Sequence, residues 1–137
     1  MSIESSIDTY LRADGTLMAL LGGAVPPTLT TGRLYYIQAP EGASLPYAVY
    51  TMVSDTDVIE HFDKKNAGQG RVQIDVVSST KSGKAIEERI RTLLRYYHGT
   101  MDTLTVWLSE PAGRRESYNA DTNRYVFSAD YILHVEY

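Results

Sequence analysis

The sequence contains no cysteine, and this absence excludes several classes of protein. A chain without thiols has no disulfide framework, no iron–sulfur cluster, no cysteine-type zinc site and no thiol nucleophile. Positive charge is also scarce, because 13 lysines and arginines stand against 17 aspartates and glutamates for a net charge of −4. Proteins dedicated to nucleic-acid binding neutralise phosphates with an excess of basic residues. The charge balance therefore disfavours that function, although it leaves room for a local basic patch.

Long hydrophobic runs are missing as well. The longest nearly uncharged stretch, residues 16–31, is interrupted by two glycines and two prolines, and it is shorter than the ~20 apolar residues of a membrane-spanning helix. The first residues carry acids, and no basic segment followed by an apolar one indicates a secretory signal peptide. We therefore expect a protein without a membrane span that starts in the cytoplasm.

Phenylalanine and tryptophan are rare, with two residues and one, whereas tyrosine occurs eleven times. Tyrosine has an apolar ring and a polar tip, so it suits half-buried sheet faces and protein interfaces. The aromatic composition thus favours a protein that assembles. With 137 residues, of which 43% are apolar, we expect a single domain over residues 1–137, since one domain usually takes ~100 to 150 residues.

Two segments have the apolar spacing of amphipathic helices. Residues 3–21 repeat apolar side chains at three- and four-residue steps, and Gly15 marks an irregularity in this helix. A second helix follows Ser79 or Thr80, either of which is a suitable cap. Its apolar stripe contains Ile86, Ile90, Leu93, Leu94 and Tyr97, and its solvated side contains Lys84, Glu87, Glu88, Arg91 and Arg95.

Five segments have strand character, and two long polar loops separate some of them. The strands are expected at 34–37, 47–53, 71–77, 103–108 and 125–136, and the loops at 55–70 and 110–124. The order α-β-β-β-α-β-β has no repeated β-α alternation, so it predicts an α+β fold with a largely antiparallel or mixed β-sheet packed with two helices. The expected core consists of Ile74, Val76, Ile86, Ile90, Leu93, Val106, Phe127 and Leu133.

No group of side chains predicts catalysis or metal binding. Histidine occurs with carboxylates at Glu60, His61 and Asp63, in a charged loop, and at Asp130, His134 and Glu136, along one strand face. For both groups we expect solvated charge rather than ligation. Residues 79–84 (STKSGK) lack the first glycine and the final Ser/Thr of a phosphate-binding loop, and no serine-hydrolase or zinc-protease motif occurs. We expect no catalytic residue, metal or cofactor, and no enzymatic activity.

Four segments, in this order, carry a resemblance: 17–23 (LMALLGG), 34–37 (LYYI), 39–50 (APEGASLPYAVY) and 71–76 (RVQIDV), the last running into a Ser/Thr-capped helix. The sequence resembles the tail-completion or tail-terminator proteins of long-tailed bacteriophages and prophages. The structural signature lies in the segment 39–50. Pro40 and Gly42 are predicted to form a turn, and Leu45 to anchor it through apolar contacts. Pro46 is predicted to favour an extended entry into the next strand, and Tyr47 to begin, with Val49, a row of side chains that faces the core.

The resemblance implies a structural virion protein that terminates the tail tube and forms the tail side of the head–tail joint. Its implied partners are further copies of itself, in a hexameric ring that is compatible with a monomer in solution, the tail tube protein and a head-completion or connector protein. It implies a place at the head-proximal end of the tail, after assembly in the host bacterial cytoplasm. Neither a membrane nor a specific nucleic-acid sequence is implied, although DNA would pass through the ring.

Two alternatives stay open. A head-completion or connector adaptor would bind on the head side and favour a different ring number. A small-ligand-binding or enzymatic α+β domain would require a concave pocket with convergent polar groups.

The candidate interface residues lie in the two polar loops. In 55–67, Val58, Ile59 and Phe62 stand among charged residues, and a loop tip has no core in which to bury them. We expect a partner to cover them, the alternative being that they pack on their own sheet. The basic pairs of the two loops are candidates for contact with phosphate or an acidic protein partner, the alternative being ordinary solvated charge. The candidate set is Asp57, Val58, Ile59, His61, Phe62, Lys64, Lys65, Arg114 and Arg115.

Overall fold

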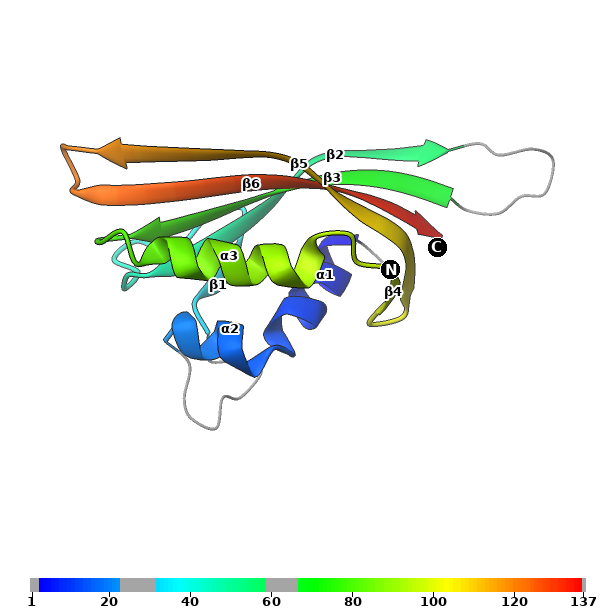
Figure 1. The fold of residues 1–137 in the computed structure, drawn as a ribbon, viewed down its shortest axis with the longest axis horizontal. Coiled ribbons are helices and arrows are strands. Elements are labelled where there is room, and N and C mark those ends of the chain that lie inside the picture. Colours follow the sequence, from blue (N-terminus) through cyan, green and yellow to red (C-terminus); the bar gives the residue numbers. More distant parts are fainter. Residues whose placement is uncertain (1–2, 23–31, 59–66, 137) are drawn as a thin grey trace.

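The computed structural model describes residues 3–22, 32–58 and 67–136, which form one twisted sheet with helices against one of its faces (Figure 1). The helices are α1 (Ile3–Arg12), α2 (Gly15–Leu20) and α3 (Gly83–Leu94). The strands are β1 (Leu34–Tyr36), β2 (Tyr47–Val58), β3 (Ala67–Ser78), β4 (Gly99–Met101), β5 (Leu104–Asn119) and β6 (Arg124–Glu136). In these parts of the chain, no helix is both long and apolar enough to cross a membrane.

The sheet has the strand order β1-β2-β3-β6-β5-β4. Strand β1 runs parallel to β2, and every other neighbouring pair is antiparallel. The expected α+β class with a mixed sheet is therefore confirmed. The expected order and the two-helix count are only partly correct, because the first helix is divided into α1 and α2 and a short strand, β4, precedes β5.

Asp14 divides the expected first helix. Its backbone is extended (φ −87°, ψ 109°), and its carboxylate accepts a hydrogen bond from the Leu17 N–H at 2.8 Å. Asp14 is therefore the N-cap of α2, which begins at Gly15, the position where the sequence predicts an irregularity. The Arg89 guanidinium of α3 donates to both Asp14 oxygens, at 2.6 and 2.9 Å. This hydrogen-bonded pairing holds the pKa of Asp14 below its ordinary value.

Replacing Asp14 with alanine should lower the free energy of unfolding by about 1 to 3 kcal/mol at neutral pH, because both the cap and a charged hydrogen bond are lost. Asp14→Asn keeps a cap acceptor and loses the charge. Since the folded-state pKa is depressed, the stabilisation by this carboxylate is complete above its ordinary pKa of 3.8 and is lost as pH falls through the folded-state pKa. In urea titrations at pH 7 and at about pH 3, the difference between wild type and Asp14→Asn should shrink at the lower pH. An equal difference at both would contradict this role.

Both segments expected as long loops contain paired strand. Strands β2 and β3 stay paired as far as Val58 and Ala67, and β5 continues through Pro111 to Asn119 beside β6. In β5, residues 113–119 are exposed, so the backbone pairing holds them extended without the alternation of buried apolar residues that marks a strand in sequence. The residues between β2 and β3, 59–66, lie outside the described parts of the chain.

Irregularities in β5 explain why the sequence pattern of apolar residues does not predict the full length of this strand. The register with β6 shifts between Val106 and Leu108 and again between Pro111 and Gly113. Each shift is a β-bulge, and a bulge accommodates proline within a strand. The first bulge reverses the phase of the strand, because Leu108 is exposed and Ser109 is buried. The alternation that buries Leu104 and Val106 therefore ends at Val106.

The core lies between the sheet and the helices. Of the expected core residues, all are buried except Leu93, which is partly buried against the others. The first two helices and Leu21, the C-cap of α2, contribute the fully buried Ile3, Ile7, Leu11, Leu17, Met18 and Leu21. Strand β6 adds Tyr131, Ala129 and Val135. At the start of β2 the buried row is Ala48 and Tyr50, so the prediction that Tyr47 and Val49 face the core is wrong. Which face of β2 is buried depends on how β2 packs against β1 and α1, and the tertiary structure decides this.

Helix α3, which is the second helix expected from the sequence, begins a few residues after the predicted cap positions. Its N-cap is Ser82, and Ser79 and Thr80 belong to the preceding turn. Gly83, the first helical residue, lies so close to β3 that an added Cβ would be 2.6 Å from the Ser78 Cβ and 3.1 Å from a Phe127 ring carbon. The absence of a side chain at Gly83 thus lets α3 start directly against the sheet.

Candidate assembly surfaces

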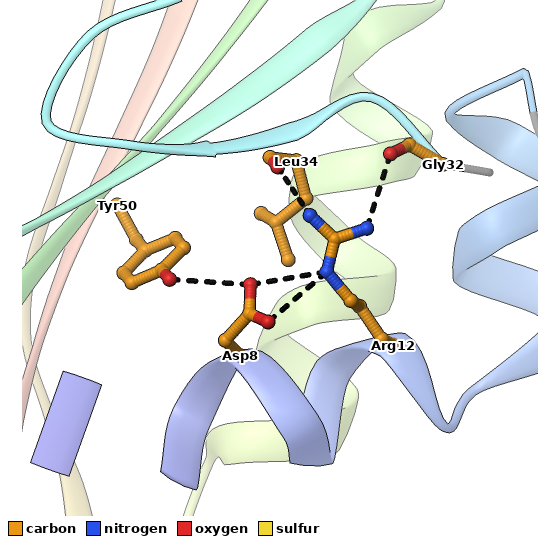
Figure 2. A network of polar contacts seen from close by, with 5 residues as sticks. All are labelled: Asp8, Arg12, Gly32, Leu34 and Tyr50. Atoms are coloured by element: carbon orange, nitrogen blue, oxygen red, sulfur yellow. Dashed lines mark hydrogen bonds and ion pairs between the residues drawn. The ribbon is translucent and has the colours of Figure 1, made fainter. Parts of the chain in front are cut away.

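A polar network fixes α1 to the β1–β2 edge of the sheet (Figure 2). The Arg12 guanidinium donates to the Leu34 carbonyl at 2.6 Å and to the Gly32 carbonyl at 3.3 Å, and it pairs with Asp8 at 3.1 Å. The Tyr50 hydroxyl donates to the same aspartate, and burial followed by the charge of Asp8 raises the pKa of Tyr50. The network therefore positions the first helix against the strand that follows the signature segment.

The signature residues form the turn and the strand entry next to this network. Residues 40–43 make a turn, in which the Ala43 N–H donates to the Pro40 carbonyl at 3.0 Å and Gly42 has a φ of +76°. Arg33 donates to the carbonyls of Pro46 at 2.9 Å and Leu45 at 3.3 Å. Tyr47 and Leu45 are half-buried. The geometry is that of a structural corner, with backbone groups satisfied within the chain.

Two arms extend from the sheet toward opposite ends of the molecule (Figure 1). One arm consists of the far ends of β5 and β6, where Asn119 pairs with Arg124. The other consists of the far ends of β2 and β3, where Val58 pairs with Ala67. Of the candidate interface residues, Asp57 and Val58 are the last two of β2, whereas Ile59, His61, Phe62, Lys64 and Lys65 lie outside the described residues.

Ion pairs connect the β5–β6 arm to α3. Arg114 binds the Glu87 carboxylate through two nitrogens, and Lys84 pairs with Glu116 at 2.5 Å. The Glu87 side chain is 5% exposed, so the prediction that it lies on the solvated side of its helix is wrong. It is buried where Arg114 of the arm packs against α3. The hydrogen bond to Glu87 raises the pKa of Arg114, and the Lys84–Glu116 bond raises the pKa of Lys84 and lowers that of Glu116.

On the face opposite the described helices, Asp130 lies between two arginines. Arg71 donates to it at 2.8 Å, and Arg115 is 3.7 Å from its other oxygen. The Asp130 side chain is only 6% exposed, so the expectation of solvated charge is wrong at this position. His134 pairs instead with Glu110 of β5, at 2.6 Å. Among the described residues, no group of three or more histidines and carboxylates could hold a metal ion.

A hollow of about 420 Å³ lies where the β5–β6 arm passes the N-terminal end of α3. Three aromatic rings line it. The Tyr118 and Tyr125 ring centroids are 4.6 Å apart, and Tyr125 stacks on Phe127 at 6.4 Å. Lys81, Lys84, Glu116 and Ser117 complete the lining. Sequence reasoning missed this surface because it treated 110–124 as a loop, whereas the cross-strand pairing of Tyr118 with Tyr125 creates the aromatic row.

A comparison with protein families matches almost the whole chain. The model of the family described as "Tail completion protein gp17" matches residues 6–135. The chain belongs to this family. As a member of this family, the chain is a structural component of a bacteriophage tail, as the resemblance of its sequence segments predicts.

Solved structures share the fold of this tail completion protein. A chain in the structure described as the virion of a native gene transfer agent (GTA) particle has a TM-score of 0.70 at 14% identity, with 99% of this chain and 96% of that chain covered. A second solved chain has a TM-score of 0.59 at 10% identity, with 98% and 94% covered. No match was found among curated proteins. At these identities the structural likeness shows the fold alone.

Proposed function

We propose that this tail completion protein terminates the tail tube and forms the tail side of the head–tail joint, as a ring of identical subunits without enzymatic activity. The observation that carries the proposal is the family match over residues 6–135. Its contacts would be further copies of itself, six in a closed ring, the tail tube protein, and a head-completion or connector protein. Its place would be the head-proximal end of the tail, reached from the host cytoplasm.

The shape of the subunit supports a ring. A closed ring requires heterologous contacts, in which two different surfaces of each subunit meet. The β5–β6 arm and the β2–β3 arm lie at opposite ends of the molecule and differ in sequence and charge (Figure 1). Two distinct surfaces at opposite ends are compatible with head-to-tail contacts, and the rotation between neighbours would determine whether the ring closes.

The direct test is termination of tails in a reconstituted assembly. Tail tube protein that polymerises without this chain should give tubes of uncontrolled length, and adding the purified chain should stop growth and allow heads to join. Electron microscopy with a label on the chain should place it at one end of each tail. Label on isolated heads, with tube length unaffected, would favour the head-side adaptor and contradict the proposal.

We also propose residues 55–67 as an assembly segment. Changing Val58, Ile59 and Phe62 together to serine should leave the melting temperature of the isolated subunit unchanged, because under this proposal a partner, and not the subunit's own core, covers these side chains. In the same assembly, overlong or headless tails should accumulate. Val53→Ser is a matched control, since Val53 is an exposed apolar residue earlier in β2, at 53% exposure, and its loss should leave tails normal. A large fall in melting temperature of the triple variant would show that the three side chains belong to the fold.

A further inference from the structure

A second hollow, of about 480 Å³, lies where the exposed side of α3 meets β5. The helix contributes Glu88, Arg91, Thr92 and its C-cap Arg95 to the lining, and β5 contributes Arg114. The four residues from the helix follow one another at steps of three, one and three positions, and helical residues three or four positions apart share one face. The lining is therefore mainly arginine, although the net charge of the chain is −4.

Two of these arginines differ from all the others in the chain. Within residues 3–22, 32–58 and 67–136, the side chains of Arg91 and Arg95 form neither a hydrogen bond nor an ion pair. A carboxylate, carbonyl or hydroxyl partner is present for each of the others: Arg12, Arg33, Arg71, Arg89, Arg114, Arg115 and Arg124. A guanidinium group has five N–H donors in a planar fork that fits a carboxylate. The donors of Arg91 and Arg95 are thus available to a ligand.

Neighbouring side chains hold the rim of the hollow in place. The Arg95 guanidinium lies over the ring of Tyr96, 5.1 Å from its centroid, and such a cation–π contact restricts its orientation. Arg114 is fastened to the Glu87 carboxylate through two nitrogens. The arginines at the two sides of the hollow are therefore oriented before any ligand arrives, which lowers the entropic cost of binding.

A buried tyrosine shows that Arg91 and Arg114 approach each other from α3 and β5. The Tyr131 hydroxyl is buried and has no hydrogen-bond partner in the described parts of the chain. Burial raises the pKa of Tyr131 to about 12 and Glu87 adds to this rise, whereas the charges of Arg91 and Arg114 lower the pKa. Both guanidinium groups thus act on the same hydroxyl, behind the hollow.

The charge of the hollow fits a single carboxylate better than a polyanion. Glu87 neutralises Arg114, and Glu88 is itself part of the lining, so Arg91 and Arg95 leave only a small excess of positive charge. A DNA duplex carries one phosphate charge per ~1.7 Å of its axis and is held by several basic side chains along a track. The hollow offers one short step of such a track, whereas two guanidinium forks are sufficient for one acidic side chain.

We propose that the arginine hollow formed by Arg91, Arg95 and Arg114 binds a carboxylate side chain of a partner protein other than this chain, with Arg91 and Arg95 as the hydrogen-bond donors. Arginine is enriched among the residues that contribute most to binding at protein interfaces. Helix α3 lies between the far ends of the two arms (Figure 1). The ends proposed above for contacts between copies are therefore elsewhere, and the choice of a different protein rests on that proposed function.

Nuclear magnetic resonance of the ¹⁵N-labelled subunit tests the site, because each arginine gives its own side-chain Nε–H signal. The probe is an acetylated and amidated triglutamate peptide, and the control probe is the matching triglutamine. With triglutamate alone, the signals of Arg91 and Arg95 should shift together and reach a plateau. The signal of Arg89 should stay unchanged, since Arg89 belongs to the same helix but is bound to Asp14. Equal shifts with both peptides, or none with triglutamate, would overturn the proposal.

A single substitution should weaken this binding. Arg91→Gln should lower the affinity for triglutamate about tenfold, the effect of losing one hydrogen bond to a charged group. The melting temperature should stay close to that of the wild type, because Arg91 has no polar partner to lose in the described structure. Lys81→Gln removes the same charge from an exposed residue outside this hollow and should leave the affinity unchanged. Equal weakening by the two variants would show that overall charge, and not the hollow, binds the peptide.

Other occupants would give different results. If a short DNA duplex shifts the Arg91 and Arg95 signals at a lower concentration than triglutamate, the hollow binds phosphates and the proposal is overturned. If raising the subunit concentration alone shifts them, a second copy fills the hollow, which also overturns it. None of these results bears on tail termination. Conversely, a subunit that binds triglutamate at Arg91 and Arg95 but does not terminate tails would contradict the proposed function and leave the carboxylate site standing.

Discussion

Replacing Ile90 with alanine should lower the free energy of unfolding by about 2 to 5 kcal/mol, the range measured for buried aliphatic side chains cut back to alanine. Ile90 is 1% exposed and lies on the face of α3 that packs against the sheet and α2. The substitution removes apolar contacts and leaves a cavity that the surrounding strands cannot close. Because the free energy of unfolding of a domain is typically only ~5 to 15 kcal/mol, this single substitution should remove a large part of it.

Urea or thermal unfolding of the purified subunit measures this loss. Val53→Ala is the control, because it also cuts an aliphatic side chain back to alanine, at a residue that is 53% exposed, where we expect a change of at most about 0.5 kcal/mol. Similar losses at the two positions, or an unchanged melting curve for Ile90→Ala, would contradict the assignment of this helix face to the core.

Removing Arg114 should cost more stability than removing its partner Glu87. The Glu87 side chain is 5% exposed and that of Arg114 is 37% exposed, so the two ends of this ion pair differ in their access to water. In Arg114→Ala, a buried carboxylate loses its cation, and we expect a loss of about 3 kcal/mol, the lower end of the range for breaking a buried pair. In Glu87→Gln, the freed guanidinium can turn into solvent, so the loss should be smaller.

Urea titrations of the two single variants and of the double variant at neutral pH measure this asymmetry. The double variant should be less destabilised than the sum of the singles, because it leaves no uncompensated charge. Arg115→Ala is a suitable control on the same strand, since the Arg115 side chain is 57% exposed and lies 3.7 Å from Asp130. If Glu87→Gln were as costly as Arg114→Ala, the burial of the carboxylate would not be the source of the effect.

The family of this protein was predictable from short segments of sequence, because their order and spacing are properties of the chain itself. The same holds for the strand over 71–77, for the alternating residues of β6 and for the apolar stripe of α3. Each of these elements buries one face against the core, and burial of one face produces a period of two residues in a strand and of 3.6 in a helix. Local sequence therefore determined the elements that cross the centre of the fold.

The candidate surfaces were predictable only in part. The sequence marked the 55–67 segment by its apolar residues among charges, but it gave no sign that Tyr118 and Tyr125 would lie side by side. That contact depends on the register of β5 with β6 across a connection that was expected to be a loop. Exposed arms are extended by backbone hydrogen bonds, which every residue type can form, so no apolar pattern records them.

Tertiary structure alone decided which polar residues are buried. Glu87 and Asp130 have the sequence context of solvated charges, yet each is covered by arginines from other elements, Arg114 for the first and Arg71 for the second. The division of the first helix likewise depends on Asp14, whose carboxylate caps α2 and binds Arg89 from α3. The spacing of apolar residues in a helix or strand indicates which face of that element packs against the core. An ion pair between residues 27 to 75 positions apart exists only after the elements have packed, and this is why the chain by itself could not reveal it.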